Sequence, residues 1–294
     1  MSGSSKTASA DATNGGWSGL HIEGARRGYA DTPMGQVHYW RTAPEDPKAI
    51  PLVLIHQTPW FGILYGTAMP VLSEMGFDVI ALDTPGFGLS DIPAAPPELE
   101  DYADNILPVL ELLGLDRVAI VGHHTGASIA ASFAERHPDR TACMVLHGPP
   151  LYTGEERQQR LKGVEGHEMP LAADGSHFTE HWQRVSGLFS PDATPESVQW
   201  SVFGWYLAGP KEWYGHRAAF SFDMSATLQN ISVPSLIVSN TGDSLHTATQ
   251  RVLELRPDFE YVEFESGKTT HIIYDEPEPW SRAIAAFVDK SCSP

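Results

Sequence analysis

The stretch Val118-Ala-Ile-Val-Gly-His-His-Thr-Gly-Ala127 decides the fold of this chain. Its first four residues, Val118 to Val121, are all apolar and predict a short buried strand. From Ala127 to His137 the pattern becomes helical. A strand therefore passes into a helix within a few residues, and Gly122 and Gly126 flank the turn. Glycine at both positions indicates a tight, strained turn that leaves no room for neighbouring side chains.

The residue at the centre of this turn is His124. A sharp strand-to-helix turn with the pattern Gly-x-Ser-x-Gly is a nucleophile elbow, which presents its central side chain to a substrate. The usual nucleophiles at such a turn are a hydroxyl, a thiol or a carboxylate, and none of them stands at this position. No second Gly-x-Ser-x-Gly occurs in the sequence. The motif therefore predicts the fold more directly than it predicts the chemistry.

Strand and helix patterns alternate on both sides of the elbow. Apolar runs predict strands at 24–31, 35–42, 51–55, 77–82, 118–121, 143–147, 234–239 and 261–265. Helical periodicity predicts helices at 61–75, 97–113, 127–137, 247–255 and 279–288. Repeated strand–helix units of this kind predict an α/β protein, with a mostly parallel eight-stranded sheet flanked by helices.

The segment 149–224 has a different character from the rest of the chain. Strand patterns disappear, tryptophan becomes frequent and helical periodicity dominates, so we interpret this segment as an inserted helical cap. The core then consists of residues 20–148 and 225–294. Residues 1–19 are rich in glycine, serine, alanine and threonine without apolar periodicity, and we expect them to form a disordered tail.

Composition limits the partners and the compartment. The 294 residues carry 19 basic and 37 acidic side chains, a net charge of −18, which argues against nucleic acid or anionic membrane as a partner. The sequence shows no secretory signal and no apolar run approaching the roughly 18 residues of a membrane span. Its two cysteines, Cys143 and Cys292, lie far apart, so we expect no disulfide framework and a reducing, cytoplasmic location. The oligomeric state stays open, with a homodimer as one possibility.

Polar residues follow four of the predicted strands. They are His56-Gln57, the elbow, Asp243 and His271. In an open parallel sheet, functional groups gather beyond the carboxyl ends of the strands, so these residues are expected at one edge. Each assignment has a structural alternative. Asp243 can cap the helix that follows it, His271 can be a surface-loop residue, and the elbow of His124 can be a degraded remnant.

The order of loop, elbow, acid and histidine resembles the α/β-hydrolase superfamily, in particular capped members such as haloalkane dehalogenases and C–C or ester hydrolases. The turn Asp83-Thr-Pro-Gly-Phe-Gly-Leu-Ser90 also resembles the one after that family's fourth strand. The resemblance implies that Asp243 and His271 are the acid and base of a triad. It further implies that the backbone N–H groups of Gln57 and Thr125 form an oxyanion hole. Gln57 replaces the usual glycine, and its side chain would crowd bulky acyl groups.

These residues predict a cofactor-free hydrolase that cleaves an acyl bond (ester, lactone or similar) of a small, largely apolar substrate. A neutral imidazole can attack an acyl carbon, so His124 can form an acyl-imidazole that water, activated by His271 and Asp243, then hydrolyses. In the other version His124 acts only as a base and water attacks directly. A lyase or other general-base catalyst, and a non-catalytic receptor for small molecules, are the alternatives.

Several further side chains are candidates for the substrate pocket. They are His56, Trp60, His147, Trp205 and His216. His56 equally fits a structural role in which it hydrogen-bonds the loop backbone, whereas His147 ends its strand and can reach the site. We expect His123 to pack rather than react. The places of His56, His124, His147 and His271 at strand ends explain these histidines better than shared ligation of a metal ion does. We therefore predict neither a metal site nor a cofactor.

Overall fold

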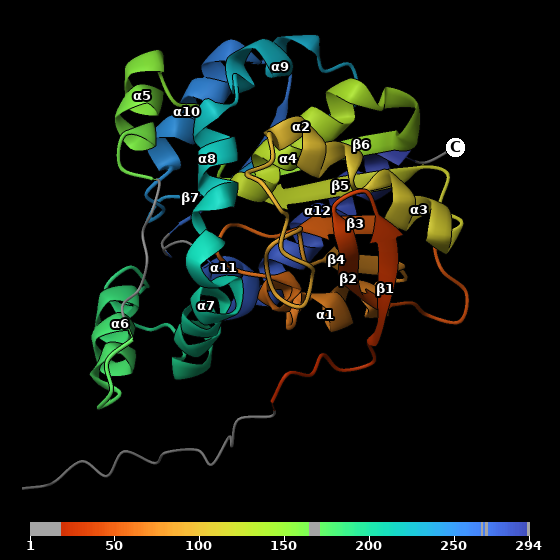
Figure 1. The fold of residues 1–294 in the computed structure, drawn as a ribbon. Coiled ribbons are helices and arrows are strands. Elements are labelled where there is room, and N and C mark those ends of the chain that lie inside the picture. Colours follow the sequence, from red (N-terminus) through yellow and green to blue (C-terminus); the bar gives the residue numbers. More distant parts are fainter. Residues whose placement is uncertain (1–18, 165–170, 266, 268–269, 293–294) are drawn as a thin grey trace, which may run out of the picture.

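The computed structural model describes residues 19–164, 171–265, 267 and 270–292 (Figure 1). The predicted tail therefore lies outside the described residues, except for Gly19. The described strands are β1 (Arg26–Thr32), β2 (Gly35–Thr42), β3 (Leu52–Ile55), β4 (Val79–Leu82), β5 (Val118–His123), β6 (Thr141–His147), β7 (Ser235–Asn240) and β8 (Glu260–Phe264). They form one sheet in the order β1-β2-β4-β3-β5-β6-β7-β8.

Strand pairing matches the prediction of a mostly parallel sheet. β2 runs antiparallel to both β1 and β4, and every other pair of neighbours is parallel. The central strands β3, β5 and β6 are buried along their whole length, as apolar runs covered on both faces should be. The carboxyl ends of β5, β6 and β7 consequently meet at one edge of the sheet, where the elbow lies.

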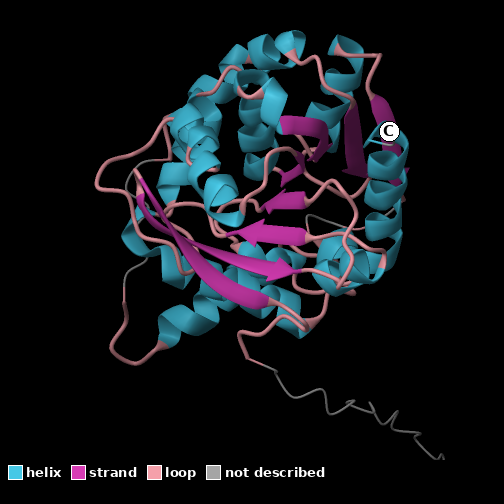
Figure 2. Ribbon diagram, turned by 90° about the vertical axis from the view of Figure 1, so that its right-hand side faces the viewer, coloured by secondary structure: helices cyan, strands magenta, loops and turns pink. Residues whose placement is uncertain are grey.

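Helices cover both faces of the sheet (Figure 2). The described helices are α1 (Ala68–Glu74), α2 (Leu99–Asp104), α3 (Leu107–Leu113), α4 (Thr125–Arg136), α5 (Gly154–Leu161), α6 (Ser176–Ser186), α7 (Pro195–Ala208), α8 (Trp213–Ser221), α9 (Met224–Asn230), α10 (His246–Leu255), α11 (His271–Tyr274) and α12 (Pro277–Cys292), with short 3₁₀ helices η1 (Gly62–Tyr65), η2 (Pro138–Arg140) and η3 (Gly209–Lys211). Helices α1, α11 and α12 belong to one apolar cluster and α2, α3, α4 and α9 to the other. The sheet therefore separates two hydrophobic cores.

Two of the predicted helices are each divided in the structure. The helix expected at 97–113 separates into α2 and α3, because Pro108 lacks the N–H that would continue the hydrogen-bond ladder and instead sits in the first turn of α3. The helix expected at 61–75 separates into η1 and α1. Helix α11 was not predicted, and its four residues are too few for periodicity to indicate a helix.

The helices α5 to α8 are inserted between β6 and β7. They gather on one side of the sheet, to the left in Figure 1, where α6 lies farthest from it. This position agrees with the segment that we interpret as a cap, although the division into core and cap stays a prediction. Among the described residues, no helix is both long enough and apolar enough to cross a bilayer.

The two cysteines meet in space, which their separation in sequence did not indicate. Cys143 lies on β6 and Cys292 ends α12, and their Sγ atoms are 3.4 Å apart. Both are free thiols in this structure, and Cys143 is buried. The contact fixes the end of the last helix against a central strand.

Three histidines, His56, His123 and His147, are buried in the core beneath the elbow. Burial lowers the pKa of each, that of His147 to about 4 and that of His123 well below its usual range. These rings are therefore neutral in the folded protein at a pH where an unfolded histidine, with a pKa of about 6.5, takes up a proton. Acid thus favours the unfolded chain.

We expect the free energy of unfolding to fall as the pH is lowered from about 6.5 towards 4, with a slope of up to about 1.4 kcal/mol per pH unit for each such histidine. His147→Gln should make this slope shallower, because it removes one group that binds a proton only after unfolding. Urea unfolding at several pH values measures the slope. His21→Gln removes an exposed histidine and serves as the control. Equal slopes for His147→Gln and wild type would contradict the expectation.

Candidate active site

The elbow forms as the sequence predicts, with His124 between β5 and α4. Its backbone φ is +50°, and within the described ranges it is the one residue other than glycine with a positive φ. This region is strained for a residue with a Cβ atom, so tertiary contacts must hold it. One such contact is made by the N–H of His124, which donates to the carbonyl of His147 at the end of β6 (2.9 Å).

The two glycines of the motif are required by close backbone contacts. A Cβ atom on Gly122 would lie 2.1 Å from the carbonyl oxygen of Gly126, and one on Gly126 would lie 2.1 Å from that of Ile55. Both distances are far below any allowed contact, so only glycine permits the approach. The prediction that small residues at these positions avoid clashes is confirmed. The contact also presses the elbow against the end of β3.

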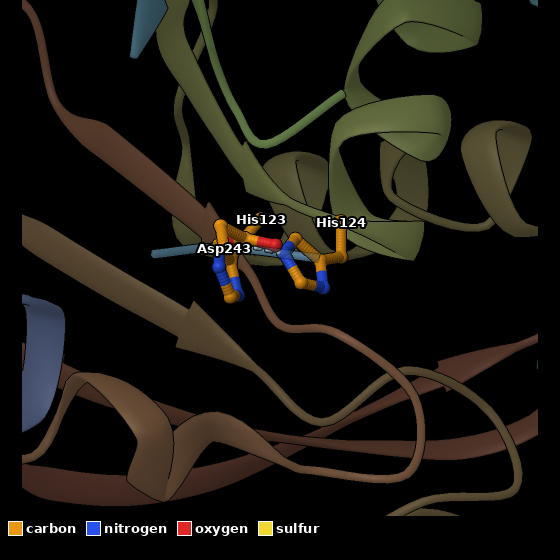
Figure 3. A group of neighbouring side chains, drawn as sticks. All are labelled: His123, His124 and Asp243. Carbon is orange, nitrogen blue, oxygen red and sulfur yellow. Dashed lines mark hydrogen bonds and ion pairs between the residues drawn. The ribbon is translucent and has the colours of Figure 1, made fainter. Parts of the chain in front are cut away.

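The side chain of His124 is hydrogen-bonded to Asp243, which follows β7 (Figure 3). The distance from His124 Nε2 to Asp243 Oδ2 is 2.7 Å, and Asp243 Oδ1 accepts the N–H of Leu245 at 2.7 Å. Burial alone would raise the pKa of Asp243, but the charge and hydrogen bond of His124 and the Leu245 N–H outweigh it and lower that pKa. Since a carboxylate only accepts, Nε2 of His124 carries a proton in this pair, and in the neutral form of the ring Nδ1 keeps a lone pair.

Gly148, directly after β6, provides the space for this pair. A Cβ atom there would lie 2.6 Å from Cδ2 and 2.8 Å from Nε2 of His124, and 3.4 Å from Oδ2 of Asp243. The residue also has a φ of +58°, which favours glycine. Sequence reasoning missed Gly148, although its place beyond a strand at the same sheet edge was a signal for it.

The expected contact between His271 and Asp243 is not made. His271 begins α11, and its Nδ1 lies 3.3 Å from Oδ2 of Asp275, one helical turn further on. Its Nε2 lies 3.5 Å from Glu276 Oε1 and 3.7 Å from Asp192 Oδ2. Asp243 Oδ2 is already bonded to His124. The pairing predicted from the order of residues is therefore wrong for this structure, because the short helix turns the ring of His271 towards its own carboxylates.

The two residues expected to form the oxyanion hole, Gln57 and Thr125, lie just after the end of β3 and at the start of α4. Gln57 follows β3, and Thr125 is the first residue of α4, whose leading N–H groups have no partner within the helix. The contact of Gly126 with the backbone of Ile55 and His56 brings the two segments together. His56 fixes this loop, because its Nδ1 donates to the Gln57 carbonyl (2.9 Å) and its Nε2 accepts from the Thr84 N–H (2.9 Å). The structural alternative for His56 is confirmed.

The histidines beneath the elbow pack against one another. The rings of His123 and His124 stack with centroids 4.0 Å apart and planes 25° apart, and the ring of His147 lies 4.6 Å from that of His123. His147 donates from Nε2 to Asn240 Oδ1 (2.7 Å) and accepts at Nδ1 from Trp280 (3.2 Å). It is therefore a buried structural residue. His123, as expected, packs in the core, between the rings of His124 and His147.

A nitrogen of His123, a nitrogen of His124 and an oxygen of Asp243 lie within 4.8 Å of one another. A metal ion lies close to the plane of each imidazole that binds it. The rings of His123 and His124 are stacked and nearly parallel, so one ion cannot lie in the planes of both rings at bonding distance. One ring would have to turn, and His123 is fully buried. The geometry therefore favours the hydrogen-bonded His124–Asp243 pair over a shared metal site.

A cavity of about 280 Å³ opens over the elbow. Its floor includes His124 and Thr125, and the inserted segment contributes further lining residues, among them Tyr152, Arg160, His216 and Phe220. A second cavity of about 410 Å³ also contacts Arg160, His216 and Phe220 and reaches Trp205 on α7. The two spaces therefore adjoin, and we call the first the elbow cavity and the second the outer cavity.

The predicted pocket residues are divided between these cavities and the core. His216 lines both cavities and Trp205 lines the outer one. Trp60 does not reach either space, because it is buried against Phe189 and Tyr274. His56 and His147 are likewise core residues. Sequence reasoning missed Tyr152, Arg160 and Phe220, and no pattern in the inserted segment distinguishes residues that face the cavity from those that face solvent.

Comparisons with known proteins agree with this architecture. The model of the alpha/beta hydrolase fold family matches residues 50–182. A haloalkane dehalogenase from Psychrobacter cryohalolentis is 33% identical over 122 residues, which are 41% of this chain and only 40% of the dehalogenase. A 2-(acetamidomethylene)succinate hydrolase from Mesorhizobium japonicum is 25% identical over 235 residues, 72% of this chain and 79% of that protein.

Solved structures share the fold over most of the chain. An esterase from Thermogutta terrifontis superposes with a TM-score of 0.74 at 20% identity, covering 92% of this chain and 100% of the esterase. An enol-lactonase from Burkholderia xenovorans gives a TM-score of 0.74 at 20% identity, covering 89% and 99% of the two chains. With the elbow at the carboxyl edge of the eight-stranded sheet, the chain has the α/β-hydrolase fold.

Proposed function

We propose that this protein is a cofactor-free hydrolase that cleaves an acyl bond of a small substrate bound in the elbow cavity. His124, at the position of the usual nucleophile, acts as the base, Asp243 orients it, and the N–H groups of Gln57 and Thr125 stabilise the oxyanion. The observation that carries the proposal is the 2.7 Å hydrogen bond between Asp243 and His124, a residue that lines that cavity. The hydrolases among its relatives support the same class of reaction.

The hydrogen bond favours a base over a covalent nucleophile. Because Nε2 donates to Asp243, the nitrogen left for chemistry is Nδ1, which is flanked by the side chain's own Cβ atom. Water reaches such a nitrogen more easily than a substituted acyl carbon does. His124 then removes a proton from water as it attacks the acyl carbon. The imidazolium, stabilised by the Asp243 carboxylate, returns the proton to the leaving oxygen.

A lyase or other proton-transfer enzyme is the second candidate. The same observation supports it, because a histidine held by a carboxylate is a complete general base without any covalent step. Hydrolysis needs an oxyanion hole and an attacking water as well. Products therefore distinguish the two: a hydrolase incorporates one oxygen from ¹⁸O-labelled water into the acid product, and a lyase does not.

Loss of the imidazole should abolish turnover. We expect His124→Gln and His124→Ala to lower kcat/KM for aryl esters by at least about 100-fold, the lower end of what a general base contributes. Circular dichroism and melting curves establish that the variants fold, and His21→Gln is the matched surface control. Hydrolysis by His124→Gln at the wild-type rate would refute the proposal. A mass adduct mapped to His124 after quenching would instead establish the covalent route.

Removal of His271 should matter much less. Its ring contacts Asp275 rather than Asp243, so we expect His271→Gln to keep kcat/KM within about tenfold of wild type, whereas His124→Gln does not. Steady-state kinetics of both variants on the same ester measure the difference. An equally severe loss in His271→Gln would mean that His271 swings towards Asp243 during turnover, as the order of residues in the sequence predicts.

The space at Gly148 gives a third test. Gly148→Ala should displace the imidazole of His124 from Asp243, because the added carbon would lie 2.6 Å from the ring. We expect kcat to fall by about 100-fold or more, consistent with misplacement of a reacting group by about 1 Å. Gly154→Ala, where nothing lies within 4 Å, is the control. Full activity in Gly148→Ala would show that the observed pair is not the reactive arrangement.

A further inference from the structure

Arg160, at the end of α5, lies in the wall of both the elbow cavity and the outer cavity. The centre of its guanidinium is 4.2 Å from the ring centroid of Tyr152 and 5.6 Å from that of Phe220. Both rings line the elbow cavity together with His124. A permanent positive charge therefore stands at the wall of the chamber whose floor holds the proposed base.

This arginine has no acidic partner among the residues that the structure describes. Two nearby arginines do: Arg157 pairs with Asp223, and Arg251 pairs with Glu156, whereas Arg184 in the outer cavity contacts Trp205 and His181. The protein as a whole carries a net charge of −18, so acidic side chains are plentiful. Arg160 is exposed to solvent, and with no acidic partner among the described residues its guanidinium is open to an anion from outside.

The contacts of Arg160 with the rings of Tyr152 and Phe220 also favour the binding of a planar anion. A guanidinium that packs on an aromatic ring through its flat face keeps its five N–H donors, which lie in the plane, free for other partners. Two of these donors match the two oxygens of a carboxylate, and the pair is stronger than a neutral hydrogen bond. Because Tyr152 and Phe220 restrict the side chain, less conformational freedom is lost when the anion binds.

Negative groups in the cavities lie elsewhere. Asp243 lines neither cavity, and its carboxylate is bonded to His124, which lines the elbow cavity. Glu212 lines the outer cavity, where its Oε2 lies 3.6 Å from Nδ1 of His216. Neither carboxylate is within ion-pair distance of Arg160, and each has a histidine beside it. The side of the elbow cavity formed by Arg160 is therefore the place where an anionic end of a ligand is favoured.

We propose that Arg160 binds a carboxylate of the substrate and thereby selects small carboxylic acids that carry an ester or lactone a few atoms from the acid group. The inference rests on the proposed hydrolase function and names its substrate class. It revises the expectation of a largely apolar substrate: the aromatic walls contact an apolar middle, and one end is charged. Arg160 is thus a specificity-determining residue rather than a catalytic one.

Two esters of equal chain length test the selection. Mono-4-nitrophenyl glutarate carries a carboxylate at the far end, and 4-nitrophenyl valerate does not. We expect Arg160→Gln to raise the ratio of KM for the glutarate to KM for the valerate by about ten- to a hundredfold, as for a lost hydrogen bond to a charged group. Arg160→Lys should give an intermediate ratio. Arg282→Gln, an equal charge change at an exposed site, should leave the ratio unchanged. An unchanged ratio in Arg160→Gln would overturn the proposal.

A binding measurement separates this inference from the proposed function. Calorimetry with glutarate, which needs no turnover, should give binding to wild type and to His124→Gln, and binding at least about tenfold weaker to Arg160→Gln. Glutarate that binds Arg160→Gln as tightly as wild type, or that does not bind wild type, sinks the inference. If glutarate binding depends on Arg160 while no ester is hydrolysed, the anion site stands and the hydrolase function falls.

Discussion

The site depends on one hydrogen bond, between the imidazole of His124 and the carboxylate of Asp243. It joins a residue after β5 to a residue after β7, so it holds two strand ends together across β6. It also decides which nitrogen of the ring carries the proton and which is free. Without it, the histidine at the elbow would be a ring at the bottom of a cavity with no fixed tautomer. The reactivity that we propose follows from this constraint.

The surrounding backbone is shaped to permit that bond. His124 is held at a positive φ, and the glycines at 122 and 126 allow the elbow to press against the end of β3. Gly148 leaves the volume in which the imidazole and the carboxylate meet. Beneath them, neutral buried histidines fill the space between β5 and α12, and Trp280 bonds to one of them. The strained turn is therefore supported by contacts with the ends of β3 and β6 and, through the buried histidines, by α12.

The sequence predicted the sheet, the elbow and the elements that carry His124 and Asp243, because apolar runs and glycine spacing report directly on backbone geometry. It did not predict which side chains would pair. Residue order indicated His271 as the partner of Asp243, but ring orientation depends on the four-residue helix α11, which leaves no periodic signal. Residues such as Arg160 were missed for a similar reason. In a helical insertion that packs around a cavity, inner and outer faces have similar composition.

The orientation of His271 has a consequence for how the site can change over evolutionary time. A serine at position 124 would supply a hydroxyl but would leave Asp243 with no imidazole, since the other candidate ring faces Asp275. A conventional triad would therefore require the ring of His271 to turn towards Asp243 in addition to a new codon at the elbow. Neither change is useful without the other. A single substitution at position 124 therefore does not convert the present arrangement into the common one.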